Sequence, residues 1–339
     1  MGVENMATVG NLALTLADLR KRTGPQGEID WVLEALNESN PILDDIPWLE
    51  GNLPTGNQTT VRTSVPMPSL RRINRGVDPS KSTTKQVADT CSIFEARSEV
   101  DIELLALAPD KAQFRRSEDV AHIEGFGQAV ARNILYGDSM TNPDEFNGLG
   151  VRYNVLKGEK GDPGYQVVSA GGTGKTNTSI WIVGWGERTV TGIYPRNTYA
   201  GLKVRDLGEN DAVDPDGRKF RAVSTLFTWK PGLAVRDQRA VAAVRNINTS
   251  NLLSLDSDGK RSLIEKFILA KNRLRNLDTV NAVAYVNDDV YSFLEIYLID
   301  KNNVHVTRRD LADGQQVLYL AGIPVRKLDA LRSDEEVIK

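Results

Sequence analysis

The chain has few of the residues from which disulfides and metal sites are built, and no long apolar run. Its 339 residues include one cysteine, Cys91, and two histidines, His122 and His305. A single cysteine excludes an intrachain disulfide and favours a reducing compartment, and the three residues are too few for a Cys/His zinc site within one chain. No run of about 18 apolar residues is present, so we expect no membrane-spanning helix and no membrane partner.

Charge and composition are ordinary for a globular protein. Hydrophobic residues make up 40% and charged residues 26% of the chain, and the formal net charge is −3. This charge excludes a global attraction to nucleic acid or to anionic membranes. The length predicts one elaborated domain or two interlocked ones. Residues 1–5 have no basic stretch followed by an apolar one, so we expect no secretory signal.

The first 90 residues are sorted by charge. Residues 28–50 hold seven acidic side chains and no Lys or Arg, whereas residues 62–85 hold six basic side chains against Asp78 alone. Extended, proline-containing segments of opposite sign favour contacts with other subunits over folding on themselves. The alternative is two solvated faces that never meet. Because Ile73 and Val77 stand where aromatic residues would be needed, the basic segment lacks a stacking platform for nucleic acid.

Periodic apolar residues predict three helices in the first half of the chain. Leucines at helical spacing predict one over 11–22, and a single apolar face predicts another over 29–37. The strongest helical pattern covers 117–136, with an acidic, cappable start at 117–119 and an end at Gly137. At about 20 residues this helix would be roughly 30 Å long.

Alternation and threonine content predict extended structure between these helices. Strands are expected over 58–65 and 69–75, and the prolines within 66–68 confine them to sheet edges or to a protruding ribbon. The stretch 87–107 alternates and predicts a third extended segment. Because an isolated ribbon is marginal in water, we expect a neighbouring subunit to hold it.

The second half of the chain predicts a strand-rich region with two helices. The helices are expected over 259–275 and 288–299. Strands are expected over 178–185, 189–194, 203–207, 220–229, 233–237, 280–286, 304–307, 316–320 and 323–325.

One string resembles a phosphate-binding loop, Gly-Gly-Thr-Gly-Lys-Thr over 171–176. The pattern needs a glycine five positions before Gly174, where the chain has Ser169, and it needs a helix next, where residues 177–178 lead into an apolar strand. A hairpin loop is the better interpretation. His122, His305 and Cys91 have no chemical partner that the sequence nominates, so we expect no catalytic, cofactor-binding or metal-ligating residue, no cofactor and no enzyme activity.

The order of parts resembles the major capsid proteins of tailed bacteriophages. The resemblance rests on an N-terminal arm, a basic extended loop and a long helix that ends in Leu-Tyr-Gly-Asp over 135–138. It includes the turn Phe-Asn-Gly-Leu-Gly over 146–150 and the closing stretch 320–331, which contains Gly-Ile-Pro-Val. The implied class is α+β with the HK-97-like capsid fold, and the implied location is the virion capsid, assembled in the cytoplasm of a bacterial host.

The resemblance also implies a division of the chain. The parts would be an N-terminal arm (1–50), an extended E-loop (51–105), a first part of the peripheral or P-domain with its spine helix (106–165), an axial or A-domain (166–303), and a P-domain return strand with the C-terminal segment (304–339).

Members of that family assemble with themselves into pentamers and hexamers around double-stranded DNA, which they enclose without sequence specificity. Separate scaffolding, portal and decoration proteins are further expected partners. The charge pattern then acquires a role, because a basic E-loop would lie on an acidic surface of the adjacent subunit. The expected contact residues of the E-loop are Arg62, Leu70, Arg71, Arg72, Ile73, Arg75, Lys81 and Lys85, and those of the arm are Glu34, Glu38, Asp44 and Asp45.

Three alternatives stay open at this point. The chain could be a nucleotide-binding enzyme that uses 171–176, or a cellular nanocompartment shell of the same fold that packages protein. Some relatives form a Lys–Asn crosslink, for which Lys81 or Lys85 with Asn276 or Asn281 could be imagined, although no motif singles them out.

Overall fold

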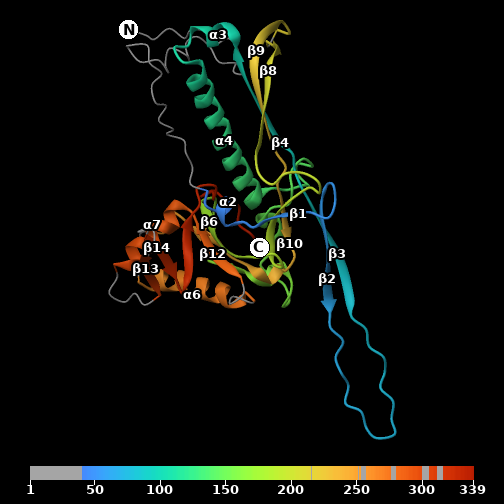
Figure 1. Ribbon diagram of the computed structural model, residues 1–339. Coiled ribbons are helices and arrows are strands. Elements are labelled where there is room, and N and C mark those ends of the chain that lie inside the picture. Colours follow the sequence, from blue (N-terminus) through green and yellow to red (C-terminus); the bar gives the residue numbers. More distant parts are fainter. Residues whose placement is uncertain are drawn as a thin grey trace. The chain divides into compact units, whose positions relative to one another are not determined.

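The computed structural model describes residues 40–214, 216–250, 252, 257–275, 280–299, 305–310 and 316–339. The predicted helices over 11–22 and 29–37, together with Glu34 and Glu38, lie outside the described residues. Within the described part, the chain divides into a smaller unit of residues 93–129 and 201–230 and a larger unit that contains the remainder (Figure 1).

The larger unit is built on a ten-stranded mixed sheet. Its main path runs β1-β7-β6-β12-β15-β14-β13, while β10 pairs with β7, and β11 pairs with both β6 and β5. The strands are β1 (Trp48–Glu50), β5 (Val167–Ser169), β6 (Asn177–Trp185), β7 (Val190–Tyr194), β10 (Gly232–Val235), β11 (Val241–Asn248), β12 (Asn281–Val286), β13 (Val306–Asp310), β14 (Gln316–Leu320) and β15 (Ile323–Lys327).

The centre of this sheet is buried on both faces. Every residue of β6 is buried, which suits its near-continuous apolar run. Helices α6 (Ser257–Arg273) and α7 (Asp288–Leu298) contribute Phe267 and Phe293 to the same apolar core. The expected helix over 288–299 is confirmed. Asn287 caps it, because its side chain accepts a hydrogen bond from the Val290 amide at 3.0 Å.

Several elements of the larger unit were not predicted, and all of them except the eight-residue β11 are short. They are strands β1, β5 and β11, helices α2 (Ile42–Asp45) and α5 (Leu149–Arg152), and the 3-10 turns η1 (Pro163–Gln166) and η2 (Gln238–Ala240). Segments of three or four residues are too short to show a period, so the sequence pattern had no signal for most of them.

The long helix α4 (Lys111–Tyr136) begins six residues before the predicted start. The Asp110 carboxylate caps it by accepting from the amides of Ala112 (2.9 Å) and Gln113 (3.0 Å). The Ser117 hydroxyl instead donates to the carbonyl of Phe114 at 2.8 Å, so the predicted start at 117 is wrong. The predicted end is confirmed, because the last residue of the helix is Tyr136. A Cβ on Gly137 would collide with Asn133 and with the Phe146 carbonyl.

The smaller unit contains a three-stranded antiparallel sheet in the order β4-β9-β8. Its strands are β4 (Phe94–Asp101), β9 (Lys219–Trp229) and β8 (Lys203–Val213), and helix α3 (Ile102–Leu107) follows β4 directly. Asp101 ends the strand and starts this helix, because its carboxylate accepts from the Glu103 amide at 2.9 Å. The prediction that 87–107 is extended throughout is therefore wrong over its last six residues.

A two-stranded ribbon projects from the larger unit (Figure 1). It consists of β2 (Gly56–Ser64) and β3 (Thr83–Thr90), paired antiparallel from Gly56 with Thr90 to Ser64 with Thr83. The predicted strand over 58–65 is confirmed, whereas the strand predicted over 69–75 is wrong. Residues 65–82 lie beyond the last pair, and the two prolines within 66–68 cannot donate to a ladder.

Candidate assembly surfaces

The outer part of the ribbon, residues 62–86, is the most exposed part of the described chain. Every residue from 62 to 86 is exposed, which includes the far ends of β2 and β3 and the whole of the ribbon loop, residues 65–82. A two-stranded ribbon of this kind is marginal on its own, and both of its edges are open. The geometry therefore presents a long surface that is suited to contact with another molecule.

All eight predicted E-loop contact residues lie on this exposed stretch. Arg62 is in β2 and Lys85 is in β3, and the other six lie in the ribbon loop. The apolar side chains there are fully exposed at Leu70 and 92% exposed at Ile73. Arginines beside exposed apolar side chains are typical of interface centres. The structure thus gathers these residues at one end of the ribbon, where Val65, Met67 and Val77 add further exposed apolar area.

The inner end of the ribbon is anchored by a buried ion pair that the sequence pattern did not indicate. A terminal guanidinium nitrogen of Arg152 lies 2.7 Å from Asp89 Oδ1, and the Asp89 side chain is only 1% exposed. The same nitrogen donates to the carbonyl of Leu233 at 3.2 Å, and Arg152 Nε donates to the carbonyl of Asn147 at 3.1 Å. A lone aspartate in a threonine-rich strand gives no signal of this role, because its partner is 63 residues away.

The predicted acidic contact residues divide into two kinds. Asp44 is exposed, whereas Asp45 is engaged within its own chain. Asp45 lies 3.0 Å from the Arg326 guanidinium and accepts a hydrogen bond from the Tyr285 hydroxyl at 2.6 Å. Burial raises the pKa of Asp45 although Tyr285 and Arg326 act in the opposite direction. We therefore leave Asp45 out of the proposed contact surface.

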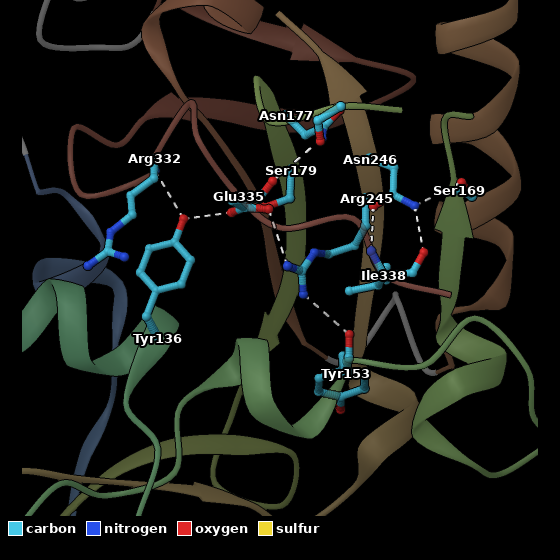
Figure 2. A network of polar contacts seen from close by, with 11 residues as sticks. Tyr136, Tyr153, Ser169, Asn177, Ser179, Arg245, Asn246, Arg332, Glu335 and Ile338 are labelled. Atoms are coloured by element: carbon cyan, nitrogen blue, oxygen red, sulfur yellow. Dashed lines mark hydrogen bonds and ion pairs between the residues drawn. The ribbon is translucent and has the colours of Figure 1, made fainter. Parts of the chain in front are cut away.

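A second buried network joins the C-terminal segment to the sheet and to the end of α4, as Figure 2 shows. The Glu335 carboxylate accepts from the Tyr136 hydroxyl at 2.6 Å and from the Ser179 hydroxyl at 2.8 Å, and it lies 3.3 Å from the Arg245 guanidinium. Both charged side chains are less than a tenth exposed. Removing one partner of such a pair leaves a buried, unpaired charge.

This network explains why the last residues lie against the sheet. Asn246 accepts from the amide of Ile338 and donates to its carbonyl, both at 3.0 Å. Burial and the neighbouring Glu335 carboxylate raise the pKa of Tyr136, so its hydroxyl remains a donor at neutral pH. Neither Arg245 nor Glu335 was nominated from the sequence, because their partners are distant along the chain.

The string over 171–176 does not have the geometry of a phosphate-binding loop. It runs directly into strand β6 and not into a helix, and the Asn177 side chain donates to the Gly174 carbonyl at 2.9 Å. No helix N-terminus is there to meet a phosphate. The segment is a loop, as expected, but the hairpin interpretation is wrong, because β11 lies between β5 and β6 and pairs with both. The nucleotide-binding alternative loses its only structural support.

Other chemical groups have packing partners. His122 stacks on Phe227 with ring centroids 5.2 Å apart. Cys91 is partly buried, and burial raises the pKa of its thiol to about 12. Among the described residues, no group of three or more His, Cys, Asp or Glu side chains is placed to hold a metal ion. No described helix combines the length and the apolar character that crossing a membrane requires.

The long helix, the mixed sheet and the projecting ribbon define an α+β chain with the HK-97-like capsid fold. A chain in the near-atomic structure of bacteriophage Epsilon15 is 30% identical, with a TM-score of 0.73, and the match covers 98% of this chain and 99% of that one. The bacteriophage JBD30 capsid is 10% identical with a TM-score of 0.51, and the match covers 88% and 93% of the two chains, which supports the fold alone. No curated protein matches the sequence.

The family follows from the sequence itself. Residues 24–339 match the model of the major capsid protein GP7 family. The chain belongs to this family, and it is a bacteriophage major capsid protein of the virion that assembles into shells.

Proposed function

We propose that the chain assembles into the pentamers and hexamers of an icosahedral shell around double-stranded DNA. The ribbon corresponds in this proposal to the E-loop, α4 to the P-domain spine, and residues 166–303 to the A-domain. The observation that carries it is the ribbon itself, because 25 consecutive residues (62–86) are exposed and combine arginines with apolar side chains. Such a segment gains most of its burial from a neighbouring copy.

Charge and apolar area have separate parts in this contact. Exposed ion pairs contribute about 0–1 kcal/mol each, so the cations chiefly guide the register of neighbouring subunits. Burial of apolar area stabilises by about 25 cal/mol per Å², so Leu70 and Ile73 supply more of the affinity. Asp44 is the described acidic residue that we keep as a candidate partner, and Glu34 and Glu38 stay predictions.

The same proposal includes the expected partners and place of assembly. Shells form in the cytoplasm of a bacterial host, with a separate scaffolding protein, a portal and decoration proteins. The protein acts as a structural component without catalysis, which its membership of a major capsid protein family supports. Packaged DNA is contacted through its phosphates without sequence readout.

The test is a charge reversal in the ribbon loop. A variant with Arg71, Arg72 and Arg75 changed to Glu should keep the wild-type circular dichroism spectrum and melting temperature, because all three side chains are exposed. It should fail to form particles in negative-stain electron micrographs.

A matched control makes the same change of charge elsewhere in the larger unit. The control carries Lys157, Lys160 and Lys175 changed to Glu, at three exposed positions outside the ribbon. It should form particles. Normal assembly of the ribbon variant, or equal failure of both variants, would contradict the proposed contact.

A further inference from the structure

The inner end of the ribbon determines where its outer end reaches. Eight residues of β2, from Asn57 to Ser64, span about 25 Å at about 3.3 Å per residue, so a tilt of about 10° at the base moves the far end by about 4 Å. A close-packed contact does not tolerate a displacement of that size. If the ribbon loop binds a neighbouring subunit, the inner end of the ribbon must keep the ribbon in one direction.

Arg152 is placed to hold it. Its guanidinium joins three separate elements of the larger unit: Asp89 of β3, the Leu233 carbonyl of β10, and the Asn147 carbonyl in the turn before α5. The planar, multiply donating guanidinium fixes direction as well as distance, which an ammonium group does not.

The backbone around this pair leaves little room for movement. A Cβ on Gly56, the first residue of β2, would collide with the carbonyl oxygen of Asp89. Just beyond the ribbon, the Cys91 amide donates to the Thr55 carbonyl and the Ser92 amide to the Pro231 carbonyl, both at 2.9 Å. The first bond joins the inner ends of the two ribbon strands to each other, and the second joins the chain after β3 to the body of the unit.

Burial of the Asp89–Arg152 pair adds little net stability, because removing its charges from water costs free energy. The Asp89 side chain is 1% exposed, and its Oδ2 atom has no hydrogen-bond partner among the described residues. Packed apolar residues often stabilise such a place as well as an ion pair does, whereas directional hydrogen bonds specify one arrangement. A fixed direction at the base of the ribbon is what places its outer end correctly.

We propose that Arg152 and Asp89 are positioning residues for shell assembly, which set the direction of the ribbon and act through the ribbon loop. This inference rests on the proposed contact between the ribbon loop and a neighbouring subunit. It predicts that loosening the base lowers assembly without altering any residue of the contact surface.

The experiment measures the direction of the ribbon in the full-length chain. Spin labels are attached to Thr84→Cys, at the outer end of β3, and to Met140→Cys, at an exposed site in the turn after α4. Electron paramagnetic resonance then gives the distribution of distances between them. Because the pKa of the native Cys91 thiol is about 12, this cysteine should remain unlabelled, and the chain without introduced cysteines checks this. Dilution with unlabelled chain keeps the measured distances within one subunit.

Two variants loosen the base to different degrees. Arg152→Met removes the side chain that donates to Asp89 and to the carbonyls of Leu233 and Asn147. Arg152→Lys keeps the positive charge but loses the planar guanidinium. Both should broaden or shift the distance distribution, and the yield of particles should fall at least about tenfold, since a factor of ten corresponds to only about 1.4 kcal/mol. Lys is the variant to use if Met prevents folding.

Glu335→Gln is the matched control, because it breaks a buried ion pair with Arg245 in the same unit and does not touch the ribbon. It should lower the melting temperature while leaving the distance distribution narrow. An unchanged distribution in folded Arg152 variants, or equal broadening in Glu335→Gln, would overturn the inference. A broadened distribution with normal assembly would overturn it too.

Failure of the proposed contact has a different signature. In that case the Arg71, Arg72 and Arg75 reversal would assemble normally, whatever the distance distribution shows. The spin-label measurement reports on the base alone, so the two hypotheses fail separately.

Discussion

At the scale of single residues, this chain uses charge in two ways. Exposed cations of the ribbon are free to meet another molecule, whereas Asp45, Asp89, Arg245 and Glu335 are buried and paired within the chain. The buried groups affect folding stability strongly, because a charge removed from water depends on its partner. Asp45 allows this to be measured through pH.

Asp45→Asn should change the pH dependence of stability. Burial raises the pKa of Asp45 in the folded chain above its ordinary value of 3.8, so the folded state binds an extra proton between the two pKa values. The stability that this proton binding contributes is fully present below pH 3.8 and is lost as the pH rises through the raised pKa of Asp45 in the folded chain. The amide keeps an acceptor for Tyr285 and does not titrate.

The measurement is urea unfolding of the wild type and the variant at a series of pH values. The free energy of unfolding of Asp45→Asn relative to the wild type should increase with pH, by about 1.4 kcal/mol for each pH unit that separates the folded from the unfolded pKa of Asp45. Asp44→Asn removes the same charge from an exposed neighbour and serves as the control. A difference between Asp45→Asn and the wild type that stays constant over this range would contradict the account.

At the scale of elements, the ribbon separates folding from assembly. Leu70 and Ile73 are almost fully exposed and contribute little to the fold of their own chain. A variant with both changed to Ser should alter the free energy of unfolding by less than about 0.5 kcal/mol. It should nonetheless reduce the yield of particles in sedimentation, because the apolar part of the contact is lost.

Met140→Ser is the comparison for that experiment. Met140 is 89% exposed, but it lies in the turn after α4 and outside the ribbon. This variant should assemble like the wild type. Equal yields from the ribbon variant and the wild type would show that the loop has no apolar role.

Sequence periodicity predicted elements well where a segment is long and has one buried face. The helices over 259–275 and 288–299 and the strand over 316–320 lie where their patterns place them. The start of α4 was missed because its cap, Asp110, stands seven residues before the predicted start, in a stretch with weaker periodicity. Proline and threonine content suggested a ribbon, but only the pairing register shows that its second strand is β3.

At the scale of the whole molecule, the sorted charges predict that salt slows assembly. Screening shortens the range of attraction from about 10 Å at 0.1 M salt to about 3 Å at 1 M. The initial rate of light scattering by purified subunits should fall by about tenfold between these concentrations, as steering by the basic loop is lost. The Arg71, Arg72 and Arg75 reversal should remove most of this dependence. A rate that is independent of salt in the wild type would contradict steering.

Patterns along the chain indicated the basic loop and the longer helices and strands, because these depend on composition and on spacing over a few turns or strand residues, which are local properties. The HK-97-like class was implied by the resemblance in the order of parts. The pairing of distant polar groups depends on the folded chain. Asp89 and Arg152 are 63 residues apart, Tyr136 and Glu335 are 199 apart, and Asp45 and Tyr285 are 240 apart. Local patterns carry no information on such pairs, because topology and sheet register bring them together.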